Sequence, residues 1–158
     1  MRKLKRQTGF GLLELMLSMV IVALLLIMAT RYYQSARSNA RINEGVGLIS
    51  SILNAANNIA IGSGSYSGAT TSAIVPYLPS NEQGSDKTSI VNPWGGEVTV
   101  TPSGTNNTLL TIVLPGLGDD CQKLKDAMGA GGNTGSYSTY DCTAGTFTVK
   151  ETLAPNAS

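Results

Sequence analysis

The chain begins with a short basic segment, followed by a long apolar run that contains a single acid. From Phe10 to Ala29 the sequence has 20 residues, and all except Glu14 and Ser18 are apolar or glycine. A helix needs about 20 such residues to cross the hydrocarbon core of a bilayer. A charged side chain inside such a helix costs about 2.5 to 3.5 kcal/mol on insertion scales, so it marks a functional position. The sequence therefore predicts a membrane-spanning helix in which Glu14 needs a partner.

The basic residues are concentrated before this run. Four of the 11 lysines and arginines lie among the first six residues, and three arginines follow the run at positions 31, 37 and 41. The N-terminal cluster predicts a cytoplasmic N-terminus and an exported C-terminal part. Without residues 1–9 the chain has seven basic and ten acidic residues. That balance gives no indication of nucleic-acid binding.

The two cysteines, Cys121 and Cys142, lie in a region rich in Gly, Ser and Thr, and the chain has no histidine. In an exported protein, an even cysteine count without other soft metal ligands predicts one disulfide. Closing a loop of about 20 residues stabilises a protein by about 3 kcal/mol in the chain-entropy model. The alternatives are a reduced pair or a zinc site, and zinc would require two further ligands.

Two simpler interpretations of the N-terminus fit the sequence less well. An ordinary secretory signal has a shorter apolar region followed by a small-x-small cleavage site. Here such residues occur only around positions 38–40, far beyond the start of the run. An uncleaved membrane anchor fits the length of the run but gives Glu14 no role.

The segment Gly9-Phe10-Gly11-Leu12-Leu13-Glu14-Leu15-Met16 resembles the prepilin signature of type IV pilins and pseudopilins, although Gly11 stands where the family usually has threonine. The resemblance implies cleavage by a prepilin peptidase between Gly9 and Phe10 and N-methylation of the new Phe10 amine. It also implies an assembly charge pair between Glu14 of one subunit and the Phe10 amine of its neighbour. Residues four apart lie about 6 Å apart along a helix axis, so an axial shift between copies can bring these charges together.

After the apolar run the pattern becomes amphipathic, with apolar residues three and four positions apart from Ile42 to Ile59. This spacing predicts one helix from Phe10 to Ile61, with two helices joined near residues 31–39 as the alternative. Glycines at 45 and 47 are weak points, and glycines at 62 and 64 end the helix. The predicted organisation is a leader at 1–9, a membrane and filament-core helix at 10–30, its amphipathic half at 31–61 and a head at 62–158.

The head is predicted to contain a small antiparallel sheet. Residues 62–96 are rich in turn-forming residues and are expected to have little regular structure. The segments 97–101 and 108–114 have strand composition and flank a turn, which predicts a hairpin. A short helix is expected at 119–128, capped by Asp119 and ended by Gly129, and a last strand at 146–150. The predicted fold class is α+β, a long N-terminal hydrophobic helix packed on a small antiparallel sheet, which is the fold that the type IV pilin resemblance implies.

Three short motifs are similar to segments of the type IVb pilins of enteric bacteria. They are Tyr-Tyr-Gln-Ser-Ala at 32–36, Ser-Tyr-Ser-Gly at 65–68 and Asn-Pro-Trp-Gly-Gly at 92–96. The lack of a helix-kinking proline points to the same subfamily, whereas the short leader and the Phe at the mature N-terminus are more typical of type IVa. The region 121–142 resembles the variable disulfide-bounded segment of the family, which implies contacts between subunits or with surfaces.

No catalytic, cofactor or metal site is predicted. The chain has no histidine and no Ser or Cys beside an evident base, so it is not expected to be an enzyme. The glycine-rich segment 129–135 is not followed by the Lys-Ser or Lys-Thr of a phosphate-binding loop. Four acidic residues were considered as calcium ligands, but their spacing matches no calcium loop: Asp119, Asp120, Asp126 and Asp141.

The sequence therefore predicts the major structural subunit of a type IV pilus, used for adhesion or a related surface function. The resemblance implies an inner-membrane precursor with a cytoplasmic N-terminus that becomes part of an extracellular filament. The implied partners are further copies of the chain, the prepilin peptidase, a pilus assembly ATPase and an inner-membrane platform protein, with no nucleic acid. The alternatives are a minor pilin or a type II secretion pseudopilin, and, in a different class, a membrane-tethered enzyme or binding module that keeps its leader.

Overall fold

The structure, a computed structural model, describes residues 11–130 and 138–153. The chain divides into two compact units, residues 1–38 and 39–158, which are described separately. In chain order the elements are α1 (Leu12–Ala60), α2 (Thr71–Ile74), the 3-10 turn η1 (Val75–Tyr77), β1 (Ile90–Val91), β2 (Glu97–Ser103), the 3-10 turn η2 (Thr105–Asn107), β3 (Leu109–Leu114), α3 (Asp120–Ala130), β4 (Ser138–Thr143) and β5 (Thr146–Thr152).

Helix α1 runs without interruption from Leu12 to Ala60. This confirms the prediction of one helix, and the alternative of two helices joined near residues 31–39 is wrong. Gly45 and Gly47 do not break the helix, because a glycine inside a helix costs only about 1 kcal/mol relative to alanine. The first unit contains the part of α1 up to Ser38, in which every described side chain is exposed except the half-buried Ser38.

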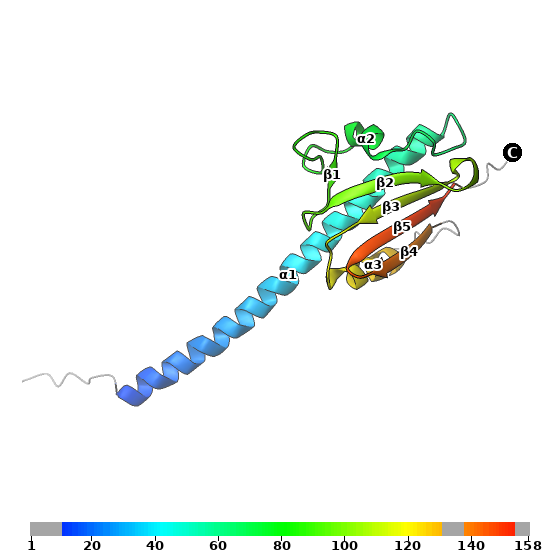
Figure 1. Ribbon diagram of the computed structural model, residues 1–158. Helices are drawn as coiled ribbons and strands as arrows, with labels where there is room; N and C mark the ends of the chain where they lie inside the picture. Colours follow the sequence, from blue (N-terminus) through cyan, green and yellow to red (C-terminus); the bar gives the residue numbers. More distant parts are fainter. Residues whose placement is uncertain (1–10, 131–137, 154–158) are drawn as a thin grey trace, which may run out of the picture. The chain divides into compact units, whose positions relative to one another are not determined.

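The second unit is built on one antiparallel sheet with the strand order β1-β2-β3-β5-β4. Strands β2 and β3 form the predicted hairpin, with Thr99 opposite Val113 and Ser103 opposite Leu109. Strand β5 lies between β3 and β4, and residues Ala144 and Gly145, both with positive φ, form the tight turn between β4 and β5. Figure 1 shows the four longer strands lying side by side in this order.

The core of this unit lies between the sheet and the part of α1 that follows residue 38. Buried residues recur along α1 with the spacing of one helix face, as in Ile42, Leu48, Ile52 and Ala56. Along β2, β3 and β5 the inner side chains alternate with outer ones, so buried residues occur at every second position. The buried strand residues are Ile90, Val98, Val100, Leu110, Ile112, Leu114, Phe147 and Val149.

Three features of the head differ from the sequence prediction. Helix α3 begins at Asp120 and continues through Gly129, and Gln122 donates a hydrogen bond to Asp126 instead of completing a cap at Asp119. The segment 62–96 has little regular structure, as predicted, and its elements are short: α2, the 3-10 turn η1 and β1. Strand β4 was missed, because its Ser, Thr and Asp residues give no apolar alternation. Its place is fixed by pairing with β5.

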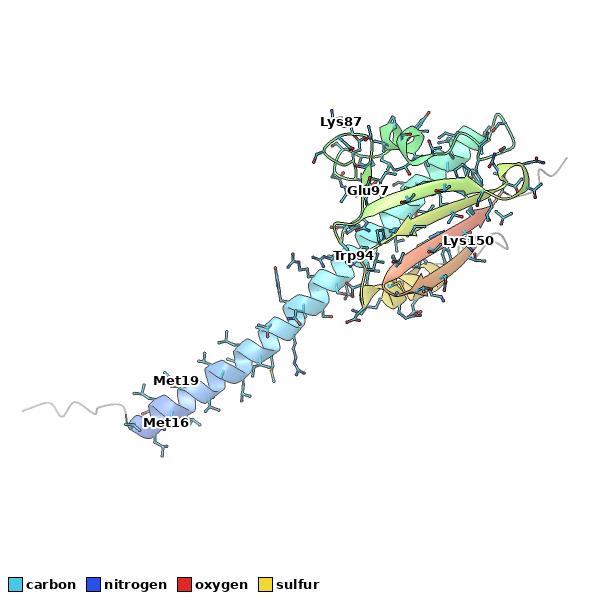
Figure 2. All side chains as sticks on the ribbon, viewed as in Figure 1. Met16, Met19, Lys87, Trp94, Glu97 and Lys150 are labelled. Carbon is cyan, nitrogen blue, oxygen red and sulfur yellow. A yellow bond between two sulfur atoms is a disulfide. The ribbon has the colours of Figure 1, made fainter. Side chains whose placement is uncertain are left out.

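The Asn92-Pro93-Trp94-Gly95-Gly96 motif joins several parts of the head. The Asn92 side chain is buried, donates to the Pro115 carbonyl at 2.8 Å and accepts from the amides of Trp94 and Gly96, each at 2.9 Å. The Trp94 indole donates to Asp120 at 3.1 Å. Its ring lies against α1 (Figure 2), where a Cβ on Gly45 would be 3.0 Å from two ring carbons. The motif therefore links α1, the start of β2 and the N-terminus of α3.

The Ser65-Tyr66-Ser67-Gly68 motif anchors the chain after α1. Tyr66 is buried, and its hydroxyl donates to the Asn57 side chain at 2.8 Å. Its amide donates to the Asn107 carbonyl at 2.9 Å, and the Ser65 hydroxyl donates to the Asn106 carbonyl at the same distance. These bonds tie the end of α1 to the turn of the β2–β3 hairpin.

Candidate assembly helix and head disulfide

Glu14 lies in the first turn of α1. The Gly11 carbonyl accepts hydrogen bonds from the amides of Glu14, at 2.9 Å, and Leu15, at 3.2 Å, so the helical pattern is established from Gly11 onward. An acid in the first turn interacts favourably with the positive end of the helix dipole. The Glu14 side chain is exposed. It is therefore open to a partner from another molecule.

The hydroxyl groups in and next to the apolar run are satisfied within the helix, whereas Glu14 is not. Ser18 donates to the carbonyl of Leu15, and Thr30 donates to the carbonyl of Ile27, each at 2.9 Å. Such bonds to the preceding turn remove the cost of placing a hydroxyl among apolar groups. Glu14 has no hydrogen bond or ion pair from its side chain within the described residues. It is the polar group of residues 12–29 that most needs an external partner.

The apolar side chains around Glu14 cover the whole circumference of the helix. Between Leu12 and Met28 the large apolar residues are 51–80% exposed, and Figure 2 shows Met16 and Met19 projecting from the helix. By length and composition, α1 contains a segment able to cross a membrane. A helix that is apolar on all sides requires lipid or other protein around it. The surface of residues 12–29 is therefore a membrane or assembly surface.

The predicted processing residues, Gly9 and Phe10, lie outside the described residues. Cleavage after Gly9, methylation of Phe10 and the charge pair of Glu14 with the Phe10 amine stay predictions. Within the described part of the chain, no group of three or more His, Cys, Asp or Glu side chains is arranged to hold a metal ion.

Cys121 and Cys142 form the predicted disulfide, which joins α3 to the edge strand β4. Their Cα atoms are 6.0 Å apart, and Cys121 is buried in the core. At the same edge of the sheet the rings of Tyr140 and Phe147 stack, with centroids 6.2 Å apart. The disulfide therefore fastens a strand whose own sequence is polar to the apolar core.

The head also contains an acidic cleft of about 240 Å³, which was not predicted from the sequence. Its wall on α1 contains Glu44, Gly47 and Leu48, and its other wall comes from residues 81–82 and 91–93. One carboxylate oxygen of Glu82 is buried without a hydrogen-bond partner, and burial raises the pKa of this carboxyl group. No sequence signal pointed to this site, because its two acids are far apart in the chain and meet only after folding.

Asp86 lies in the same loop as Glu82, but its pKa is shifted in the opposite direction. Asp86 accepts hydrogen bonds from the amide and hydroxyl groups of both Thr88 and Ser89. Led by the Thr88 hydroxyl, these bonds lower the pKa of Asp86. Asp86 is therefore satisfied inside its own turn, whereas Glu82 is not.

A long N-terminal helix, apolar at its start, together with a five-stranded antiparallel sheet, defines the α+β fold of a type IV pilin. Residues 4–30 match the prokaryotic N-terminal methylation motif, and residues 39–155 match the family described as PilS N terminal. The chain belongs to the PilS N-terminal family.

The chain is similar to the major structural subunit of the bundle-forming pilus of Escherichia coli O127:H6. The two are 29% identical over 104 residues, which is 65% of this chain and 54% of the relative. The corresponding protein of Escherichia coli O111:H- matches with the same identity and coverage. The chain thus spans about half the length of the curated relatives it matches. No solved structure matches the chain.

Proposed function

We propose that this chain is the major structural subunit of a type IV pilus, cleaved between Gly9 and Phe10 and polymerised through α1 into an extracellular filament. The observation that carries the proposal is the single acid, Glu14, which is exposed and has no partner among the described residues, in a helix segment that is apolar on all sides. The likeness to a subunit described as the major one of its pilus favours this role over a minor pilin or a type II secretion pseudopilin.

Assembly requires a preference for protein neighbours over lipid. Lipid is as apolar as the side chains of residues 12–29, so transfer of the helix from the bilayer to a filament gains little hydrophobic free energy. Packing between helices and pairing of Glu14 must supply the preference. In apolar surroundings an unpaired carboxylate and an unpaired amine are each costly. Any register that leaves these two groups apart is therefore unfavourable. The pairing of Glu14 then determines the axial position at which each new subunit joins the filament.

Cleavage has two physical consequences in this scheme. It removes four basic residues, whose burial in a filament core would be costly. It also creates the Phe10 amine, and N-methylation leaves that amine positive. The precursor would lie in the inner membrane with its N-terminus in the cytoplasm, where the prepilin peptidase acts. An assembly ATPase and a platform protein would then drive the processed chain into the filament.

The test replaces Glu14 with Ala, and Ser18→Ala serves as the matched control within the same run. We expect the Glu14→Ala chain to insert and to be cleaved normally, but to be absent from sheared surface filaments, because its register contact is lost. The Ser18→Ala chain should assemble, since the Ser18 hydroxyl is satisfied by the Leu15 carbonyl of its own helix. Electron microscopy and mass spectrometry of the sheared fraction measure assembly, and the mobility of the membrane-bound chain measures cleavage.

Two results would contradict the proposal. If the mature wild-type protein retains Met1, the chain is a tethered protein of another class. If wild-type filaments form without this chain, it is not their major subunit. Normal piliation by the Glu14→Ala chain would overturn the pairing role alone.

A further inference from the structure

The acidic cleft on the head is lined by two acids, Glu44 and Glu82. Glu44 is exposed at its edge, and Glu82 has a buried carboxylate oxygen without a partner. Val91 and Pro93 add apolar surface to the lining. A site of this kind suits a long side chain with an apolar stem and a positive end, which is an arginine or a lysine.

Arg41 is a candidate for that side chain, although not within the same molecule. Arg41 and Glu44 are three residues apart on α1, yet they form no ion pair, and the ion pair seen in the described residues joins Lys123 and Asp120. Three residues along a helix correspond to about 60° around its axis. One copy can therefore present Glu44 to one neighbour and Arg41 to another, as a repeating head-to-tail contact requires.

The proposed filament register brings these two charges to the same level. If the Phe10 amine of an incoming copy lies beside Glu14 of the preceding copy, every residue of the incoming helix lies beside a residue four positions later. Arg41 then lies at the level of residue 45, about 1.5 Å along the axis from Glu44 of the preceding copy. The other arginines on this helix, at 31 and 37, reach levels without an acid.

Gly47 supplies the room that such a contact needs. It is exposed inside a helix, where glycine is a poor choice, and a Cβ built at this position would meet nothing within 4 Å. The packing of the head therefore does not require glycine here, in contrast to Gly45, which faces the Trp94 ring. The absence of a side chain at position 47 keeps the α1 wall of the cleft open to a neighbouring molecule.

We infer that the cleft receives Arg41 of a neighbouring copy of this chain, so that Glu44 and Glu82 hold the heads in the same register that Glu14 sets in the filament core. This inference rests on the proposed function, since it uses the four-residue shift between parallel helices. It adds a second subunit contact, located on the head.

The main test is a charge swap in the full-length chain. Arg41→Glu and Glu44→Lys should each reduce the yield of sheared filaments roughly tenfold or more, because each places like charges opposite one another. The combined Arg41→Glu and Glu44→Lys chain should recover part of the yield, because the charges at positions 41 and 44 are again opposite, although Glu82 still repels the acid at position 41. Lys150→Glu, on the exposed side of β5, is the matched control and should assemble normally. Normal assembly of both single variants, or a swap no better than either, would overturn the inference.

A second test does not depend on the charged variants folding normally. Cells producing an Arg41→Cys chain and a Glu44→Cys chain together should yield a disulfide-linked dimer in sheared filaments under mild oxidation, whereas a pairing of Arg31→Cys with Glu44→Cys should not. Absence of the expected dimer from intact filaments would overturn the inference. Gly47→Leu should fill the cleft and reduce filament yield while leaving the Cys121–Cys142 bond formed.

The outcomes separate this inference from the proposed function. If the wild-type chain is absent from filaments, the proposed function fails, and this inference fails with it. If wild-type filaments form and the cleft variants assemble as well as the wild type, the chain remains a pilus subunit. In that case this cleft does not align the heads of neighbouring copies.

Discussion

The two ends of helix α1 have the same secondary structure but opposite surroundings. In residues 12–30 every side chain is exposed and nearly every one is apolar, whereas from Ile42 to Ala60 the buried residues follow one face of the helix. A helix that is apolar on all sides needs apolar neighbours on every side, whereas a helix with one apolar face needs only one layer of structure packed against that face. The first segment therefore has its partners in lipid or in other molecules, and the second has them in its own sheet.

Polar groups follow the same division. In the head, the Asn57 side chain accepts from Tyr66, and Asn92 bonds to three groups around it. In the N-terminal segment, Ser18 bonds to its own helix and Glu14 to nothing within the described residues. Glu14 would become a buried polar group in lipid or in a filament core, and such groups are normally satisfied, so we expect its partner to come from another molecule.

The largest expected difference between the two segments comes from truncating isoleucine in each. Ile52 is fully buried, and Ile52→Ala should lower the free energy of unfolding of the head by about 2 to 5 kcal/mol through lost burial and a residual cavity. Ile27 is 54% exposed, and Ile27→Ala should leave that free energy unchanged. Urea denaturation of the full chain in mild detergent, followed by Trp94 fluorescence, measures both. Equal effects would remove the distinction between the segments.

Removing the disulfide should have the next largest effect. The double substitution Cys121→Ser and Cys142→Ser should destabilise the head by about 3 kcal/mol, because the unfolded chain regains the freedom of the closed loop. The membrane insertion of α1 should not change, since this segment lies outside the loop. Denaturation with and without reductant, beside a membrane-extraction assay, tests both statements. A loss of insertion in the serine variant would contradict the separation of the two regions.

The two glycines in the second part of α1 should respond in opposite directions. Gly47→Ala should stabilise the head by about 1 kcal/mol, because alanine is the better helix former and its methyl group meets no other atom. Gly45→Ala gains the same propensity, but its methyl group presses on the Trp94 ring at 3.0 Å, and overpacking costs about 1 to 3 kcal/mol. Thermal melting followed by circular dichroism should rank Gly47→Ala above wild type and Gly45→Ala below it.

The smallest expected effect is a pH dependence of stability, and it concerns only the head. Burial, with a further contribution from the charge of Glu151, raises the pKa of Tyr66 to about 12. The unfolded chain releases this proton near pH 10, so the stability contributed by protonated Tyr66 is fully present below pH 10 and is lost as the pH rises toward 12. Unfolding midpoints measured across this range should fall for the wild type and fall less for Tyr66→Phe. Equal slopes for the two chains would show that Tyr66 does not titrate in this way.

Predictability differed between the parts of the head. The β2–β3 hairpin was predictable, because strand-like residues flank a polar turn and the pairing is local. Strand β4 was not, because a polar sequence becomes a strand only through pairing with β5 and through the bond from Cys121 to Cys142. The end of α3 was placed too early, at Gly129, because a glycine inside a helix costs only about 1 kcal/mol and packing can outweigh it.

The sequence by itself determined the apolar run, the position of Glu14 within it, the continuous helix pattern and the presence of two cysteines without other soft ligands. These are local properties, since each depends on composition or on the spacing of neighbouring residues. Only the tertiary structure decided that Trp94 packs against Gly45, that Gly47 is left open, and that Glu44 and Glu82 line one cleft. Contacts between residues distant in the chain depend on how the helix and sheet pack, and no local pattern encodes that packing.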